Sequence, residues 1–326
     1  MTTQESEVGA ETFTSRVRAI ADNVERVIQG KREVIELMLV TLLAQGHLLI
    51  EDVPGVGKTS MAKSLARSVD VPFGRIQFTP DLLPSDVVGI NVWNRTDSTF
   101  EFRPGPIFNG IVLGDEINRA SPKTQSALLE SMAEEQVTVD GTTYRLSRPF
   151  MVIATQNPIE YEGTYPLPES QLDRFLMRIS VGYPSAEGEI DVLTTHGAGS
   201  TLDTLEPVVS AEDIEAMVAT VAAVHVSPEV ARYLVDLADA TRRHPALALG
   251  MSPRATLAWQ SATRARAAIS GRSFVQPDDV KALAHHVLGH RLLLTPEAEL
   301  QGRTARDAID DVLRTVPTPS WVARRA

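Results

Sequence analysis

The residues best suited to chemistry lie in the glycine-rich stretch 51–59, which reads Glu-Asp-Val-Pro-Gly-Val-Gly-Lys-Thr. Its glycines, Gly55 and Gly57, permit backbone dihedrals and a close approach that residues with side chains resist. Successive backbone N–H groups can therefore point at an anion beside the positive end of a following helix. In such a loop Lys58 reaches the outer phosphates of a nucleotide and Thr59 holds Mg²⁺. The stretch predicts a phosphate-binding loop.

One position of this loop departs from the usual pattern, because Asp52 stands where a glycine is expected. The competing interpretation is a glycine-rich turn with a chance Lys-Thr pair. Two flanking elements oppose it: an apolar run at 48–50 predicts a buried strand, and 60–66 carries an apolar helical stripe. We expect the nucleotide phosphates to contact the loop residues Gly55, Val56, Gly57, Lys58, Thr59 and Ser60.

Composition limits the classes of protein to which the chain can belong. Its 326 residues suggest two domains, or one with a substantial appendage. No apolar run approaches the roughly 20 residues of a membrane span, and the polar start lacks a signal layout, so we expect a cytoplasmic protein. The absence of cysteine excludes disulfides, Cys-ligated zinc and thiol catalysis. The formal net charge of −11 argues against a broad nucleic-acid-binding surface.

Two further apolar runs end in polar side chains. The run 111–114 leads to Asp115 and Glu116, and the run 151–155 leads towards Asn157. In a parallel sheet the strand ends face the ligand crevice, so Asp115 can orient Mg²⁺ and Glu116 can polarise a water for attack on the γ-phosphate. Asn157 can hydrogen-bond that water or the γ-phosphate. Alone, strand-end acids and an Asn before Pro are common, but their place after a phosphate loop favours the catalytic interpretation.

Two arginines are candidates for stabilising the charge that develops on a transferred phosphate. Arg174 precedes a predicted strand at 177–181. Alone it is more often a surface charge or a partner of Asp173, but beside the other motifs we predict that it reaches the γ-phosphate of a neighbouring subunit. Arg254 begins a predicted helix capped by Ser252. A lid domain could aim it at the phosphates, and a structural ion pair is the alternative.

The break Gln29-Gly30 separates two helical patterns, 13–28 and 33–44, just ahead of the phosphate strand. At that place it could pack near an adenine. An ordinary helix C-cap explains the two residues equally well, and the sequence leaves both interpretations open.

Two insertions interrupt the predicted alternation of strands and helices. Within 79–106, prolines break the helical pattern and residues on either side of 95–98 predict the arms of a hairpin. A surface decoration and a working loop explain this hairpin equally well. Within 137–146, Asp140-Gly141 predicts a second hairpin, since Asp-Gly favours a tight turn.

The alternation ends near residue 184, and the segments beyond it are helical. Helices are predicted at 211–224, 228–243, 252–270 and 278–288. We therefore expect a flexible tail at 1–12, an α/β core at 13–184 and a helical domain at 185–326.

Together these motifs resemble the MoxR branch of the AAA+ ATPases, in the group with a helix-two insert. The resemblance covers nearly everything after residue 13 and rests on the segments 51–59, 114–120, 154–158, 163–169, 172–175 and 250–254. It implies an α/β P-loop AAA+ core with a parallel five-stranded sheet, helices on both faces and an all-α helical lid domain. It also implies hexameric rings that bind ATP and Mg²⁺ at subunit interfaces. Residues 79–106 resemble the helix-two insert, and 137–146 the hairpin before sensor one.

The resemblance assigns roles to individual residues. It implies Walker A and B roles for Lys58, Thr59, Asp115 and Glu116, with Asp115 acting on Mg²⁺ through water, and the roles of sensor one for Asn157, arginine finger for Arg174 and sensor two for Arg254. Gly114, where alanine is frequent, is expected to be neutral.

Members of this branch are thought to act as chaperone-like factors that assemble or activate other complexes, often with a von Willebrand factor A domain partner. The hypothesis is an ATP-hydrolysing homo-hexamer that remodels a protein client, which the sequence does not name. Its alternatives are a metal-chelatase-like ATPase subunit, a nucleic-acid motor of the same clade and a slow nucleotide-gated scaffold. The insertions carry few basic residues, Arg95, Arg103 and Arg145, so we do not expect nucleic acid as a partner.

Overall fold

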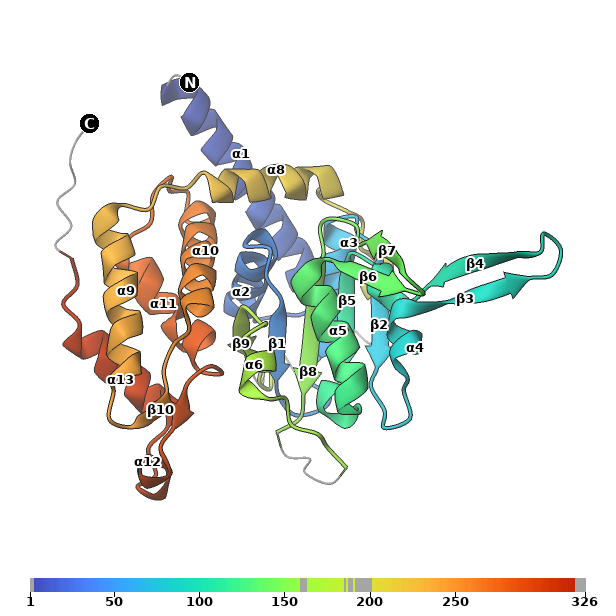
Figure 1. Cartoon of the computed structure of the whole chain (residues 1–326). Helices are drawn as coiled ribbons and strands as arrows, with labels where there is room; N and C mark the ends of the chain where they lie inside the picture. Colours follow the sequence, from blue (N-terminus) through green and yellow to red (C-terminus); the bar gives the residue numbers. More distant parts are fainter. Residues whose placement is uncertain (1–2, 159–162, 185, 187–189, 191–200, 320–326) are drawn as a thin grey trace. The chain divides into compact units, whose positions relative to one another are not determined.

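The computed structural model describes residues 3–158, 163–184, 186, 190 and 201–319, and contains a five-stranded parallel sheet (Figure 1). In sheet order the strands are β2 (Phe73–Gln77), β5 (Ile111–Asp115), β8 (Met151–Gln156), β1 (Leu48–Glu51) and β9 (Met177–Ile179). Because β1, β5 and β8 lie side by side and run in parallel, their carboxyl ends meet at one edge of the sheet. The predicted sheet is confirmed.

Apart from polar residues at their carboxyl ends, the central strands are apolar, because helices cover both of their faces. Helix α5 (Pro122–Glu134) covers one face, and α2 (Arg32–Leu43) and α3 (Lys58–Ser68) cover the other (Figure 1). Leu128 of α5 packs in one buried cluster with Leu49 and Val112 of the sheet. Burying one such side chain contributes roughly 1.5–3 kcal/mol, so this packing stabilises α5 on the sheet.

Helix α5 begins at a capped first turn. The Ser121 hydroxyl accepts a hydrogen bond from the Thr124 backbone N–H, and Pro122 occupies the first turn. Such a cap contributes about 1 kcal/mol. The short turns η2 (Ile117–Arg119) and α6 (Glu169–Leu172) lie on either side of α5 in the sequence.

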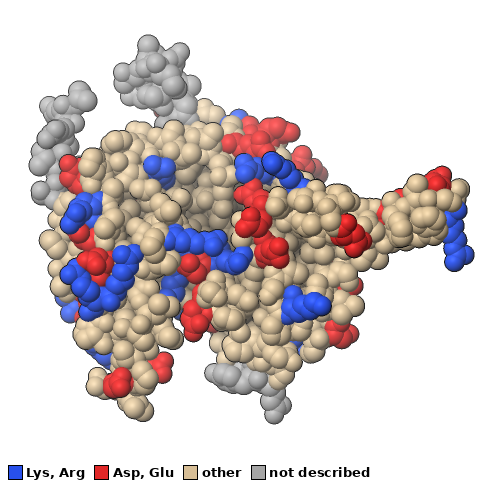
Figure 2. All heavy atoms as spheres, in the orientation of Figure 1, with Lys and Arg blue, Asp and Glu red and all other residues tan. Residues whose placement is uncertain are grey.

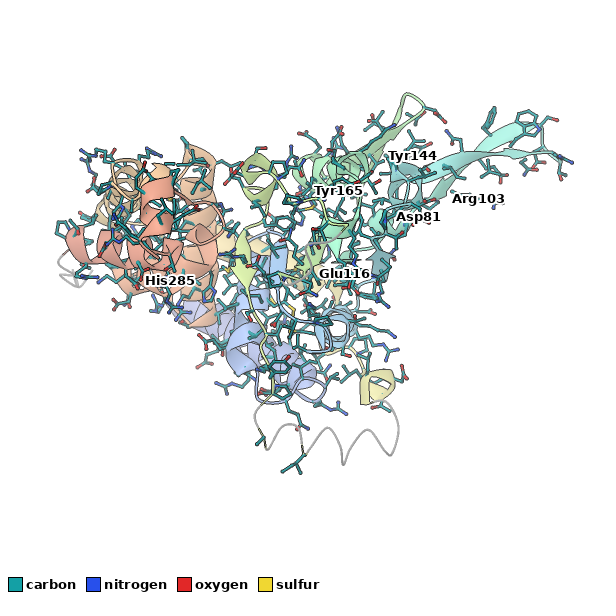
Figure 3. The ribbon with its side chains drawn as sticks, turned by 90° about the horizontal axis from the view of Figure 1, so that it is seen from below. Asp81, Arg103, Glu116, Tyr144, Tyr165 and His285 are labelled. Carbon is teal, nitrogen blue, oxygen red and sulfur yellow. The ribbon has the colours of Figure 1, made fainter. Side chains whose placement is uncertain are left out.

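Both predicted hairpins are present and contact each other. After α4 (Pro84–Val88), the first consists of β3 (Gly89–Asn94) and β4 (Thr99–Pro104), followed by η1 (Pro106–Phe108); the second consists of β6 (Gln136–Val139) and β7 (Thr142–Arg145). The first projects from the core, and Figure 3 labels Arg103 and Tyr144 where the two meet. Phe102 stacks on Tyr144 with ring centroids 4.1 Å apart, and the Asn91 amide donates to Asp140 at 2.8 Å. The insertions therefore form one connected structure.

The chain forms two compact units, which we describe separately. The α/β unit contains residues 15–175 and 179–218, and the helical unit contains the residues before Ser15, residues 176–178 and the chain from Ala219 onward. The boundary between the units falls near residue 218, because the chain through η3 (Thr201–Thr204) packs with the α/β unit. The boundary predicted from the sequence was residue 184. Helix α1 (Thr3–Glu25) also begins inside the segment predicted to be a tail. The domain limits given in the sequence analysis stay predictions.

The helical unit contains the predicted helices. These are α9 (Pro228–Arg242), α10 (Pro253–Ile269) and α11 (Pro277–Leu288), preceded by α8 (Ala211–Ala222), which spans the boundary between the units. The sequence reasoning missed α12 (Pro296–Leu300), α13 (Ala305–Thr315) and the short antiparallel pair β10 (Leu247–Leu249) and β11 (Leu293–Leu294). Asp279, only 3% exposed, accepts bidentate hydrogen bonds from Arg272 at 2.7 and 2.6 Å.

Within the described parts of the chain, no helix combines the length and the apolarity that a bilayer crossing requires.

Candidate active site

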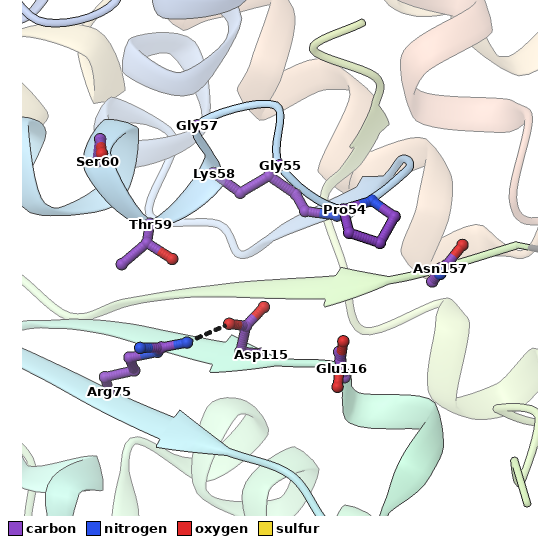
Figure 4. Close-up of a pocket in the computed structure, with 10 residues that line it drawn as sticks. All are labelled: Pro54, Gly55, Gly57, Lys58, Thr59, Ser60, Arg75, Asp115, Glu116 and Asn157. Atoms are coloured by element: carbon purple, nitrogen blue, oxygen red, sulfur yellow. Dashed lines mark hydrogen bonds and ion pairs between the residues drawn. The ribbon is translucent and has the colours of Figure 1, made fainter. Parts of the chain in front are cut away.

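A pocket of about 390 Å³ opens at the carboxyl edge of the sheet (Figure 4). It is lined by Pro54, Gly55, Gly57, Lys58, Thr59, Ser60, Arg75, Asp115, Glu116 and Asn157. The loop after β1, the end of β5 and the residue after β8 supply most of this lining. Its volume lies in the range of sites that bind small molecules.

The glycines of the loop have the backbone that the sequence predicted for them. Gly55 and Gly57 have φ values of +86° and +85°, in the left-handed region where a side chain causes strain. A Cβ added to Gly57 would also lie 3.3 Å from Cδ1 of Ile28, so the turn ahead of Gln29-Gly30 packs against this loop.

The loop holds Lys58 by its own carbonyl groups. The ammonium donates to the backbone oxygens of Asp52 at 2.9 Å and Val53 at 3.2 Å. Burial lowers the pKa of Lys58, and the carboxylates of Asp52, Asp115 and Glu116 counter only part of that effect. A partly desolvated cation gains more from an anion than one in bulk water. This environment is compatible with phosphate binding by Lys58, which stays a prediction.

Thr155 fixes the two strand-end acids. Its hydroxyl donates to Oδ1 of Asp115 at 2.7 Å and accepts from the backbone N–H of Glu116 at 2.9 Å. Thr155 is fully buried in β8, next to β5, so these contacts connect two strands. Thr155 was not among the residues predicted from the sequence.

Arg75 occupies the other oxygen of Asp115. Its guanidinium lies 2.8 Å from Oδ2 of that carboxylate, as the dashed line in Figure 4 shows. The two residues come from neighbouring strands, because β2 pairs with β5 and Gln77 lies opposite Asp115. Arg75 was also missed, since the sequence does not show that β2 and β5 are neighbours.

Glu116 has an unusual backbone and defined side-chain contacts. Its φ of +59° is left-handed, which costs a residue with a side chain on the order of 1–3 kcal/mol and is often found at functional sites. Its Oε2 accepts from the Gln77 amide at 3.1 Å and lies 3.3 Å from Nε of Arg119. Glu116 is thus held at the pocket by its backbone and by its side chain.

Asn157 completes the pocket at the end opposite to Ser60 (Figure 4). It is 6% exposed and comes just after β8, as predicted from the apolar run. The structure therefore brings together the predicted groups Lys58, Thr59, Asp115, Glu116 and Asn157. Their catalytic and binding roles stay predictions.

Four predicted residues of the α/β unit do not line this pocket. Val56 is buried within the loop, and Gln29 and Gly30 lie in the neighbouring turn, where Gly30 has a φ of +68°. That φ fits a helix C-cap, and the packing of the turn on the loop fits a place near the nucleotide, so both interpretations remain open. Arg174 instead donates to the backbone oxygen of Leu129 at 2.7 Å.

Arg254 belongs to the helical unit, in the first turn of α10. The predicted cap is present, because the Ser252 hydroxyl accepts from the Ala255 N–H at 3.0 Å. The role of Arg254 at the phosphates stays a prediction.

The donor atoms suit a magnesium ion. The hydroxyl of Thr59 and the carboxylate of Asp115 are hard oxygen ligands, which Mg²⁺ prefers, and it commonly keeps several waters. Figure 4 shows both side chains on the walls of the same pocket. Asp115 can take part through a water, because its own oxygens already accept from Thr155 and Arg75.

Comparisons with known proteins identify both parts of the chain. Residues 47–177 match the ATPase family associated with various cellular activities (AAA), and residues 239–312 match the AAA lid domain. The chain is 50% identical over 298 residues to the uncharacterized protein YeaC of Bacillus subtilis, covering 91% of this chain and 93% of that protein. It is 42% identical over 324 residues to a Mycobacterium tuberculosis protein named Chaperone MoxR1, covering 95% and 85%.

A solved structure is similar over nearly the whole chain. A crystal structure of a Cytophaga hutchinsonii protein superposes with a TM-score of 0.91 at 37% sequence identity, covering 97% of this chain and 99% of that one.

Proposed function

Because the chain belongs to the MoxR family of AAA ATPases, we propose that it hydrolyses ATP with Mg²⁺ and uses the cycle to remodel or assemble protein complexes. One observation carries the hydrolytic part. Lys58 and Thr59 of the glycine loop share a pocket with the strand-end acids Asp115 and Glu116. This is the set of groups that phosphoryl transfer from a nucleotide requires.

Each residue has a defined task in this mechanism. The loop amides and Lys58 bind the phosphates, and the ammonium exchanges the carbonyls of Asp52 and Val53 for phosphate oxygens. Thr59, and Asp115 through a water, would hold Mg²⁺, which would supply positive charge to stabilise the transferred group.

Glu116 orients the attacking water and takes its proton. Gln77 and Arg119 both contact Oε2 of Glu116, so Oε1 is the oxygen that accepts this proton. Asn157 hydrogen-bonds the water or the γ-phosphate from the other side.

The direct test is ATP turnover by substituted chains. Lys58→Ala and Glu116→Gln should each lose nearly all activity, and Glu116→Gln should still bind ATP because it keeps the loop. Glu130→Gln is a matched control, since Glu130 is exposed on α5. Near-normal turnover by both Lys58→Ala and Glu116→Gln would exclude the ATPase mechanism.

We further propose a homo-hexameric ring in which Arg174 acts across a subunit boundary. Its contact with the Leu129 carbonyl fixes the guanidinium away from the pocket of its own subunit. An Arg174→Ala chain mixed with a Glu116→Gln chain should regain part of the lost turnover, because some sites would then contain both intact groups. A mixture no more active than its components would count against shared sites.

The remodelling part of the proposal depends on the projecting hairpin β3–β4. Trp93 and Phe100 form an edge-to-face pair there with centroids 5.0 Å apart, although they are 48% and 70% exposed. Exposed aromatic pairs are suited to contact with another protein. The relative named Chaperone MoxR1 supports a protein client, and we propose a von Willebrand factor A domain partner. Recovery of such a partner with Glu116→Gln in the presence of ATP tests this.

The charges on the hairpin favour a protein over nucleic acid as its target. Figure 2 shows both acidic and basic side chains near the free end of the projecting hairpin, with uncharged residues over most of its visible face. Nucleic-acid binding depends on clustered Lys and Arg instead. ATP hydrolysis that is stimulated by DNA would favour the nucleic-acid motor.

A further inference from the structure

Asp52 makes contacts that the glycine expected at its position lacks. It follows β1 directly, at the first position of the glycine loop, and is 8% exposed. Its Oδ2 accepts from the Ser180 hydroxyl at 2.9 Å, the Val181 N–H at 2.7 Å and the Gly182 N–H at 2.6 Å. Its Oδ1 accepts from the Val53 N–H at 2.9 Å. The carboxylate therefore joins the loop to residues 180–183, which we call the anchor segment.

These contacts keep Asp52 ionised. Burial raises its pKa, but the hydrogen bonds from Gly182, Ser180, Val53 and Val181 outweigh burial and lower the pKa overall. Hydrogen bonds to an ionised carboxylate are about twice as strong as those between neutral groups. A glycine offers none of them.

The anchor segment is also held from a second side. Lys31 donates from its ammonium to the Tyr183 carbonyl at 2.7 Å. Lys31 follows the turn whose Ile28 packs beside Gly57. The glycine loop, the turn before α2 and the anchor segment therefore contact one another in a closed circuit around Asp52.

Asp52 also contacts the lysine that binds phosphate. Its backbone oxygen accepts a hydrogen bond from Lys58 at 2.9 Å, while its carboxylate accepts hydrogen bonds from the anchor segment. When Lys58 moves to a phosphate, the backbone oxygen of Asp52 loses its hydrogen-bond donor, whereas the carboxylate of Asp52 keeps its donors in the anchor segment. A change at the phosphates thus acts on a residue that is bonded directly to the anchor segment.

We propose that Asp52 is a positioning residue that couples nucleotide binding in the pocket to the anchor segment 180–183. The coupling rests on the proposed binding of ATP. This coupling would explain why Asp52 stands where a glycine is usual. The carboxylate would position the loop for Lys58, and phosphate binding would alter the contacts of the chain beyond β9. A purely structural anchor would stabilise the fold but would leave nucleotide affinity unchanged.

The test combines nucleotide affinity with hydrogen exchange, using ATPγS and Mg²⁺ as the probe. In the wild-type chain, ATPγS should alter exchange in the peptide that contains Val181 and Gly182. Asp52→Asn and Asp52→Gly should lose that response and bind ATPγS about tenfold more weakly, the cost of ordering roughly one more residue on binding. Asp213→Asn is the matched control, since Asp213 also accepts from a serine hydroxyl and amide.

Ser180→Ala gives a milder variant that removes one donor from the carboxylate and keeps the other contacts of Asp52. It should reduce affinity by about twofold to threefold, within the range for one partly exposed hydrogen bond. Unchanged affinity and an unchanged exchange response in Asp52→Asn and Ser180→Ala, with normal binding by the wild type, would overturn the coupling alone. A wild-type chain that does not bind ATPγS would overturn the proposed function and the coupling with it.

Discussion

Replacing Thr155 by valine should damage both stability and catalysis, because one hydroxyl holds the two strand-end acids. Valine keeps the shape of threonine and its β-branch, so it fits the fully buried site in β8. It removes the hydrogen bond to Asp115 at 2.7 Å and the acceptor of the Glu116 N–H at 2.9 Å. No other contact of the strand needs to change.

The size of the effect follows from these two bonds. A hydrogen bond to a charged group contributes about 1.5–3 kcal/mol, and an unsatisfied N–H costs about 1–3 kcal/mol. Water can replace part of both, since the side chains of Asp115 and Glu116 are 16% and 26% exposed. We therefore expect Thr155→Val to lower the free energy of unfolding by about 2–3 kcal/mol. Thr155→Ser keeps both bonds and should cost only about 1 kcal/mol for its lost methyl group.

The assay pairs urea unfolding with ATP turnover. Without its anchor, Glu116 can leave the left-handed backbone conformation with φ +59°, so its carboxylate loses its orientation to water. We expect kcat to fall at least about tenfold in Thr155→Val and to stay near wild type in Thr155→Ser. If Thr155→Val unfolds within about 0.5 kcal/mol of wild type and turns over normally, the anchoring role of the hydroxyl is wrong.

The sequence predicts the pocket well where chemistry and spacing coincide. Gly55 and Gly57 are left-handed, and Asp115 and Asn157 arise at the ends of apolar runs that become β5 and β8. These features are local, because a left-handed turn needs glycine and a strand buried on both faces needs a continuous apolar run. The Asp140-Gly141 turn is predictable for the same reason, and its φ values of +49° and +81° confirm it.

The residues that support the pocket are not predictable in this way, because they depend on which strands are neighbours. Arg75 and Gln77 read as ordinary alternating residues of a half-buried strand until β2 is known to pair with β5. In the sequence, Asp52 is only a departure from the glycine-loop pattern, because the backbone N–H groups that donate to its carboxylate lie about 130 residues away. Sequence patterns therefore identify the candidate groups for nucleotide binding, and the sheet order identifies the residues that hold those groups.

Three further substitutions test these supporting contacts. Arg75→Gln should change the free energy of unfolding by less than about 1 kcal/mol, because Arg75 is 49% exposed. It should also lower the Mg²⁺ concentration for half-maximal nucleotide binding, because it frees Oδ2 of Asp115. An unchanged Mg²⁺ titration would contradict this second expectation. The pKa of Asp52 is lowered by folding, so its stabilisation is complete above the ordinary pKa of about 3.9 and is lost as pH falls through the folded value. The unfolding free energies of wild type and Asp52→Asn should therefore differ by a constant amount near neutral pH and converge below about pH 4, and a difference that persists in acid refutes the ionised anchor. Gly114→Ala was expected to be neutral, but its Cβ would lie 3.0 Å from Cε2 of the buried Phe78. Overpacking destabilises the fold by about 1–3 kcal/mol, and the reduced freedom of the unfolded chain without this glycine stabilises it by about 0.4–1 kcal/mol. Urea unfolding should therefore show a net loss of stability near 1 kcal/mol. Equal or higher stability would mean that the Phe78 ring moves aside freely.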